Sequence, residues 1–219
     1  MYNRPEDIRD FFDQSSSEFF GSRNGAAIHG KGRAKVLEIL SHSIALLAKA
    51  GPAGFSMRQV AAEMGVKLSA IQYYFPNREA LTTAMGLYFE FLFHERQNKV
   101  LDRNYPTPLA RLEAFLDFSL DVGDTPPLLF SVLSECQTTS PGMAEAVERC
   151  YARHIEAIDE LLTPLTPHLS DGQRRSRASL LCAAIDGLEI FFSEGPTLAP
   201  SSAGLRQNCR SDLLKLALA

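Results

Sequence analysis

A cluster of hydrogen-bonding and cationic side chains lies between residues 67 and 78 of this 219-residue chain. The cluster combines hydroxyls, one amide and two flanking cations: Lys67, Ser69, Gln72, Tyr73, Tyr74 and Arg78. Such groups bind phosphate oxygens, and a glutamine amide can also pair with a base edge. An ordinary surface helix of this length would more often carry glutamate and lysine. We therefore interpret the cluster as a candidate nucleic-acid contact surface.

A first short helix is predicted just before this cluster. Its apolar positions follow helical spacing: Met57, Val60, Ala61 and Met64. Ser56 precedes this face and Gln59 stands three residues later. This spacing predicts a capping box, in which the serine oxygen accepts a backbone N–H and the glutamine reaches back. Gly65 then ends the helix, because glycine adopts the left-handed conformation at little steric cost.

A second short helix is predicted to carry the cluster. Leu68, Ile71 and Phe75 form its apolar face, and Pro76 ends it because helix is disfavoured in the residue before a proline. Helix, glycine turn and helix is the helix-turn-helix layout, whose second helix lies in the DNA major groove. The alternative is a plain helical hairpin with half-buried tyrosines and solvated cations.

The run from Ile39 to Leu81 resembles the DNA-binding domain of the TetR/AcrR transcriptional regulators. The resemblance rests on a serine cap, an apolar-alanine pair, a turn, an aromatic run and a helix start: Ser56, Val60-Ala61, Met64-Gly65-Val66-Lys67, Gln72-Tyr73-Tyr74-Phe75 and Asn77-Arg78-Glu79. The motif covers roughly a fifth of the chain. Two positions depart from the family pattern, because Lys67 replaces the usual serine and Gln72 the usual first tyrosine. Both bear on which DNA sequence is read.

The candidate DNA contacts extend over both predicted helices. They are Ser56, Arg58, Lys67, Leu68, Ser69, Gln72, Tyr73, Tyr74 and Arg78. We expect Arg78, with Ser56 and Tyr74, to bind backbone phosphates, because Arg78 lies where the next helix begins. We expect Gln72 to read an adenine in the major groove. Lys67 should reach a phosphate or a guanine, since the helix dipole disfavours a cation there without an anionic or acceptor partner.

The charge of the chain is distributed unevenly. Residues 31–81 hold seven Lys/Arg and three acidic residues, a net charge of +4, whereas the whole chain has a formal net charge of −4. The cationic charge is therefore concentrated where phosphates would be bound, and the remainder can repel them. A helical scaffold that binds only protein, the alternative function, would not need this asymmetry.

The rest of the chain predicts further helices and no strand of any length. The expected fold is all-α with about nine helices, in which an N-terminal helix-turn-helix domain precedes a helical bundle. We expect a flexible extension over residues 1–30, the DNA-binding domain over 31–92 and a regulatory domain over 93–219. No stretch reaches eighteen apolar residues and no secretory signal is seen, so a cytoplasmic protein without a membrane span is expected.

The regulatory domain is expected to form a dimer and to bind a small molecule. The run 178–192 is apolar nearly all round, so one side can face its own bundle while the other needs a partner. The resemblance implies that the last two long helices pair with those of a second subunit. It also implies an inducer cavity, for which the candidates are Phe115, Phe118, Phe130, Gln137, Cys150, Tyr151 and His154. An ordinary apolar core is the alternative for these residues.

Catalytic and metal-binding motifs are lacking. The sequence contains no HExxH, no GxSxG and no glycine-rich phosphate loop, and its four cysteines show no CxxC spacing. We therefore expect no enzymatic activity, no metal and no cofactor. The expected function is a homodimeric repressor that binds a palindromic DNA operator and is released by a small-molecule inducer, since repression is the default of the resembled family.

Overall fold

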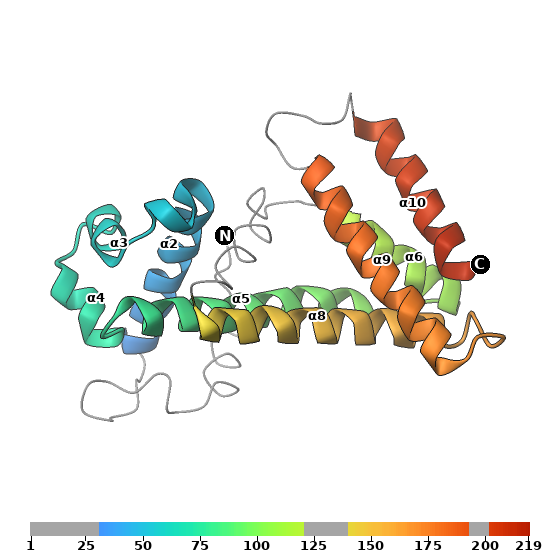
Figure 1. Cartoon of the computed structure of the whole chain (residues 1–219), viewed down its shortest axis with the longest axis horizontal. Coiled ribbons are helices and arrows are strands. Elements are labelled where there is room, and N and C mark those ends of the chain that lie inside the picture. Colours follow the sequence, from blue (N-terminus) through green and yellow to red (C-terminus); the bar gives the residue numbers. More distant parts are fainter. Residues whose placement is uncertain (1–30, 121–139, 193–201) are drawn as a thin grey trace. The chain divides into compact units, whose positions relative to one another are not determined.

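The computed structural model describes residues 31–120, 140–192 and 202–219, and these residues form eight α-helices and no strand. The helices are α2 (Lys31–Gly54), α3 (Met57–Glu63), α4 (Leu68–Tyr74), α5 (Arg78–Leu101), α6 (Pro108–Leu120), α8 (Pro141–Leu162), α9 (Asp171–Phe192) and α10 (Ser202–Leu218) (Figure 1). The predicted all-α class is confirmed. The predicted N-terminal extension over residues 1–30 lies outside the described residues.

The described residues divide into two compact units. The first contains residues 31–92 and 140–148, and the second contains 93–120, 149–192 and 202–219. Helices α5 and α8 each contribute to both units. None of the described helices is long and apolar enough to cross a membrane. The expected division into a DNA-binding domain at 31–92 and a regulatory domain at 93–219 stays a prediction.

The first unit is built on α2, which buries Val36, Ile39, Leu40 and Leu47 completely. Gly51 interrupts α2 with φ of 68°, a conformation open to glycine, so the helix kinks there before one further turn. Helix α3 packs against both α2 and α4 (Figure 1). The two short helices are thereby held on the longer one.

The beginning of α5 also packs closely against the beginning of α8 in this unit. Ser140 stands before α8, where its hydroxyl lies 3.0 Å from the Thr82 hydroxyl and donates to Glu79 Oε1 at 3.1 Å. A β-carbon added at Gly142 would lie 2.7 Å from Thr83 Cβ and closer still to the rest of that side chain. Glycine is therefore required at position 142 by the approach of the two helices.

Gly142→Ala should destabilise the protein by about 1–3 kcal/mol, because the added methyl group forces Thr83 or the α8 backbone to move. The free energy of unfolding in urea measures this effect. Gly172→Ala is the matched control, since a β-carbon there meets nothing within 4 Å in α9. The control should be neutral or stabilising by up to about 1 kcal/mol. Equal effects of the two substitutions would contradict the packing argument.

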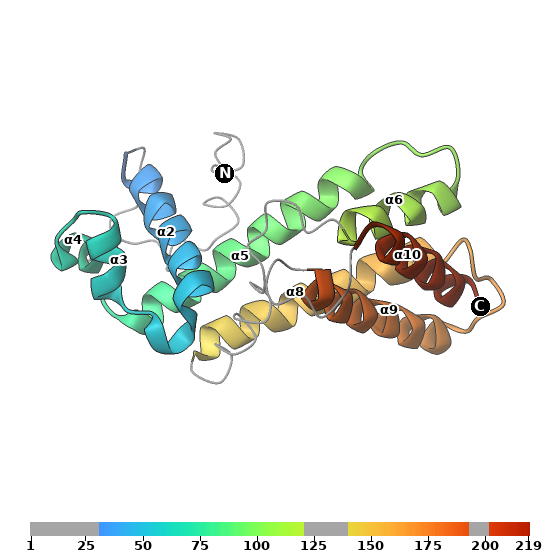
Figure 2. The same ribbon diagram turned by 90° about the horizontal axis from the view of Figure 1, so that it is seen from above.

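The second unit has its own apolar core, formed by α6, the later part of α8, α9 and α10. Helix α10 packs against α9 and α6 (Figure 2). The buried positions include Leu112, Phe115, Leu116, Ile158, Leu162, Leu181, Ile185 and Ala217. This unit encloses most of the predicted ligand-binding residues.

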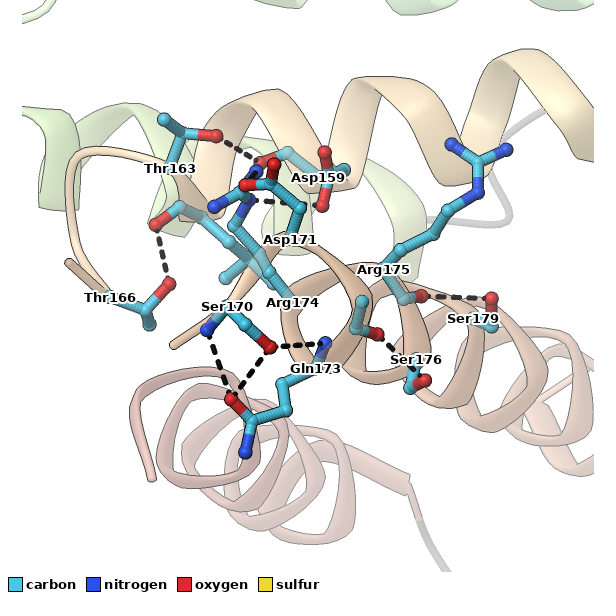
Figure 3. A network of polar contacts seen from close by, with 12 residues as sticks. Asp159, Thr163, Thr166, Ser170, Asp171, Gln173, Arg174, Arg175, Ser176 and Ser179 are labelled. Atoms are coloured by element: carbon cyan, nitrogen blue, oxygen red, sulfur yellow. Dashed lines mark hydrogen bonds and ion pairs between the residues drawn. The ribbon is translucent and has the colours of Figure 1, made fainter. Parts of the chain in front are cut away.

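Polar contacts fix the connection from α8 to α9 in the second unit (Figure 3). Arg174 donates from Nε to Asp159 Oδ1 at 3.1 Å and from Nη2 to Asp171 Oδ1 at 2.9 Å, so one guanidinium joins the two helices. Ser170 and Gln173 form a reciprocal capping box, with the Ser170 N–H donating to Gln173 Oε1 at 2.9 Å and the Gln173 N–H donating to Ser170 Oγ at 3.4 Å. The start of α9 is thus held by both a salt bridge and a cap.

Candidate functional site

The short helix α3 is capped by Ser56, as the sequence predicts. The Gln59 N–H donates to Ser56 Oγ at 3.3 Å. The glutamine side chain differs from the expected capping box, because its Oε1 accepts from the Ser56 hydroxyl at 2.8 Å instead of from a backbone N–H. Gly65 has φ of 64° and produces the turn that the sequence predicts. Helix α4 then begins after Lys67, which makes no side-chain cap.

Helix α4 has an apolar inner face and a polar outer face. Ile71 and, just beyond the helix, Phe75 are buried, with 0% and 2% of their surface exposed. Tyr73 is 52% exposed, although an aromatic ring is usually covered. The rings of Tyr73 and Tyr74 meet edge to face at 4.9 Å between centroids. The inner residues anchor the helix, and the outer ones are free to meet a large partner.

Arg78 has a structural contact as well as an exposed position. Its Nη2 donates to the Pro52 carbonyl at 3.1 Å, and its guanidinium carbon lies 5.8 Å from the centre of the Phe55 ring. A guanidinium has five N–H donors, so further donors remain for a phosphate. Asn77 caps α5, since its Oδ1 accepts from the Ala80 N–H at 2.8 Å. Arg78 thus ties the start of α5 to the end of α2.

The nine predicted DNA contacts all lie in the first unit, on or beside α3, α4 and the start of α5. The exposed members are Arg58, Lys67, Ser69, Tyr73 and Arg78, and the half-buried members are Ser56, Leu68, Gln72 and Tyr74. The Ser56 hydroxyl is used in the α3 cap, which the sequence also predicts. Contact of these residues with DNA stays a prediction.

The predicted ligand residues are brought together in part. Phe115 is buried, and its ring centre lies 5.4 Å from that of His154 and 6.4 Å from that of Phe118. Cys150 is buried and Tyr151 half-buried on α8, within one turn of His154. The two remaining candidates, Phe130 and Gln137, lie outside the described residues.

The sequence did not point to the contribution of α5 to this region. The Phe93 ring centre lies 5.4 Å from that of His154. We call Phe93, Phe115, Phe118 and His154 the His154 cluster. Helical spacing can assign Phe93 to an apolar face, but it does not say which helix that face meets. Asp186 on α9 was also missed, and its carboxylate hydrogen-bonds to the half-buried Tyr151.

His154 is held neutral in this environment. Burial, reinforced by the nearby His94, lowers the pKa of the His154 imidazole from 6.5 to about 4. Burial also raises the pKa of the Asp186 carboxyl, and the Tyr151 hydrogen bond opposes that shift. The interior of the second unit therefore disfavours charge on both side chains.

A helix-turn-helix with a buried inner face, an exposed polar face and a surrounding excess of cations defines a DNA-binding protein. Residues 39–85 match the family of bacterial regulatory proteins called the tetR family. The chain is also 40% identical, over 70 residues, to an uncharacterized HTH-type transcriptional regulator in the dhlA 5′ region of Xanthobacter autotrophicus. That match covers 32% of this chain and only about a third (33%) of the curated relative. Residues 39–85 therefore form a DNA-binding domain of the tetR family.

Solved structures of low sequence identity share the fold over most of the chain. A transcriptional regulator from Pseudomonas aeruginosa PAO1 is 16% identical, with a TM-score of 0.71 over 94% of this chain and 91% of that one. AibR, solved in complex with isovaleryl coenzyme A and operator DNA, is 14% identical, with a TM-score of 0.63 over 84% of this chain and 98% of that one. These similarities confirm the fold, including its helices beyond residue 85.

Proposed function

We propose that this regulator is a homodimeric repressor that binds a palindromic operator in the cytoplasm and is released by a small molecule. The observation that carries the proposal is the outer face of α4, where exposed Ser69 and Tyr73 and half-buried Gln72 lie on a helix anchored by Ile71. A two-fold dimer fits this function, because two recognition helices then meet two half-sites of the DNA. AibR, which shares the fold, binds both an operator and a small molecule.

The outward face of α9 supports dimer formation. Leu180 is 53% exposed there, beside the exposed Ser176, Ser179 and Ala183. The two serine hydroxyls already donate to carbonyls of their own helix, from Ser176 to Gly172 and from Ser179 to Arg175 (Figure 3). The side chains of this face are thus either apolar or already hydrogen-bonded within their own helix. This is the surface that a second helix can cover at little desolvation cost.

Selection of bound sequences from random DNA, followed by a screen for compounds that release the protein, tests the proposed function. We expect a palindromic sequence to be enriched and at least one compound to release it. A scaffold that binds only protein would enrich no sequence. Such an outcome would refute DNA-dependent regulation and favour the alternative function.

Gln72→Ala should flatten the preference at one base pair in each half-site by about 1–3 kcal/mol, because a bidentate contact to adenine is lost. Non-specific affinity should change little. Arg78→Ala is the contrasting variant, and it should weaken binding to all DNA sequences alike. It should also reduce, by about one, the magnitude of the slope of the logarithm of the binding constant against the logarithm of the salt concentration. Binding titrations on the selected and on random DNA measure both. Equal weakening by Gln72→Ala on the two DNAs would assign Gln72 to the backbone instead.

A further inference from the structure

The interior of the second unit contains buried hydrogen-bonding atoms that no described residue satisfies. His154 is only 5% exposed, and neither its Nδ1 nor its Nε2 has a hydrogen-bond partner within the described ranges. Gln97 on α5 is also buried, and its Oε1 likewise has no partner there. Folded proteins leave few such atoms unsatisfied, because an unmade buried hydrogen bond is costly. These three unsatisfied atoms, two on His154 and one on Gln97, point to an occupant that supplies hydrogen bonds.

The surroundings of these atoms are aromatic. The ring centres of Phe93 and Phe115 each lie 5.4 Å from that of His154, and Phe118 lies next to Phe115. Gln97 follows Phe93 by four residues, so the two side chains lie on the same face of α5. Apolar walls with a few convergent polar atoms are typical of a small-molecule site. The flat rings favour a flat occupant.

The charge state of the site limits the chemistry of the occupant. Because the pKa of His154 is lowered to about 4, its imidazole is neutral near pH 7. A neutral imidazole offers one N–H donor and one nitrogen acceptor. A hydroxyl group can either accept from the N–H or donate to the unprotonated nitrogen, whereas a carboxylate can only accept. A phenolic hydroxyl has a pKa of about 10 and therefore enters uncharged.

We propose that the His154 cluster binds an uncharged aromatic alcohol of the phenol class, whose hydroxyl pairs with His154 and whose ring lies against the phenylalanines. This inference rests on the proposed ligand response and specifies its ligand. His154 is the residue that selects the hydroxyl. When the His154 N–H donates to the hydroxyl oxygen, Gln97 Oε1, one turn beyond Phe93, supplies the acceptor for the hydroxyl hydrogen.

The test compares phenol, toluene and benzoate on the full chain without DNA. Calorimetry gives the three affinities for the wild type, for His154→Phe and for His168→Phe. The first variant keeps an aromatic ring in the cluster but removes both nitrogens. The second makes the same change at an exposed histidine of the same unit. Long-range proton–nitrogen NMR of the histidine rings reports directly whether phenol perturbs His154.

Phenol should bind the wild type about tenfold more tightly than toluene, the equivalent of one net hydrogen bond. His154→Phe should abolish this preference while toluene still binds, and His168→Phe should retain it. Three results would overturn the inference. The wild type could fail to bind phenol, or His154→Phe could weaken phenol and toluene equally. Benzoate could also bind as tightly as phenol in both proteins, which would make Arg96 the recognising group, since its guanidinium carbon lies 5.3 Å from the centre of the Phe118 ring.

The same experiment separates this inference from the proposed function. A protein that recognises an operator but does not bind phenol would contradict the ligand class alone. A protein that binds phenol with the expected preference but enriches no DNA sequence would contradict the regulatory function alone.

Discussion

Leu180→Arg should convert the proposed homodimer to a monomer. In a two-fold interface each substitution is present twice, so two buried leucine contacts are lost and two cations are brought into an apolar contact. A leucine contributes about 1.5–3 kcal/mol when it is buried, so the dissociation constant of the dimer should rise at least about 100-fold. Light scattering should give the 24.2 kDa mass of one chain instead of twice that value.

Operator binding should decline with the dimer. A monomer offers one recognition helix to one half-site, so affinity for the palindrome should approach the non-specific level, which is typically about 10³-fold or more weaker than specific binding. Leu109→Arg is the matched control, because this leucine on α6 is also exposed, at 37%. The control should remain dimeric. A wild-type monomer, or a dimer that survives Leu180→Arg, would exclude α9 as the interface.

Acidification from pH 7 to pH 4 should cost the folded protein roughly 3 kcal/mol through His154 alone. The folded-state pKa of about 4 lies below the ordinary value of 6.5. Between these values the unfolded chain binds a proton that the folded chain does not bind. The free energy of unfolding therefore rises with pH in this window, and the stability is lost as the pH falls below about 6.5.

His154→Phe should remove this part of the pH dependence. Urea unfolding at pH 4, 5, 6 and 7 measures it as the difference between variant and wild type, so that the protonation of carboxylates cancels. At pH 7 the variant should be at least as stable as the wild type, because two unsatisfied buried nitrogens are gone. His168→Phe, an exposed control, should keep the wild-type slope. Parallel curves for wild type and His154→Phe would show that His154 is not held neutral.

The sequence by itself determined the local structure and the family. The cap at Ser56 and the turn at Gly65 each depend on groups a few residues apart, so spacing and residue type were sufficient to predict them. The burial of Ile71 and Phe75 followed from helical periodicity for the same reason. The family resemblance rested on this same contiguous segment. The match of the tetR family to residues 39–85 confirms it.

Only the tertiary structure decided which distant residues meet. Arg78 donates to Pro52, which is 26 positions away, and Ser140 bonds to Glu79 across 61 positions. Periodicity places a residue on a face of its helix but does not identify the helix that this face meets. His154 could therefore be noted in the sequence as a candidate. Its neutral state and its unsatisfied nitrogens arise from Phe93 and Phe115, which only the packing of α5, α6 and α8 brings to it.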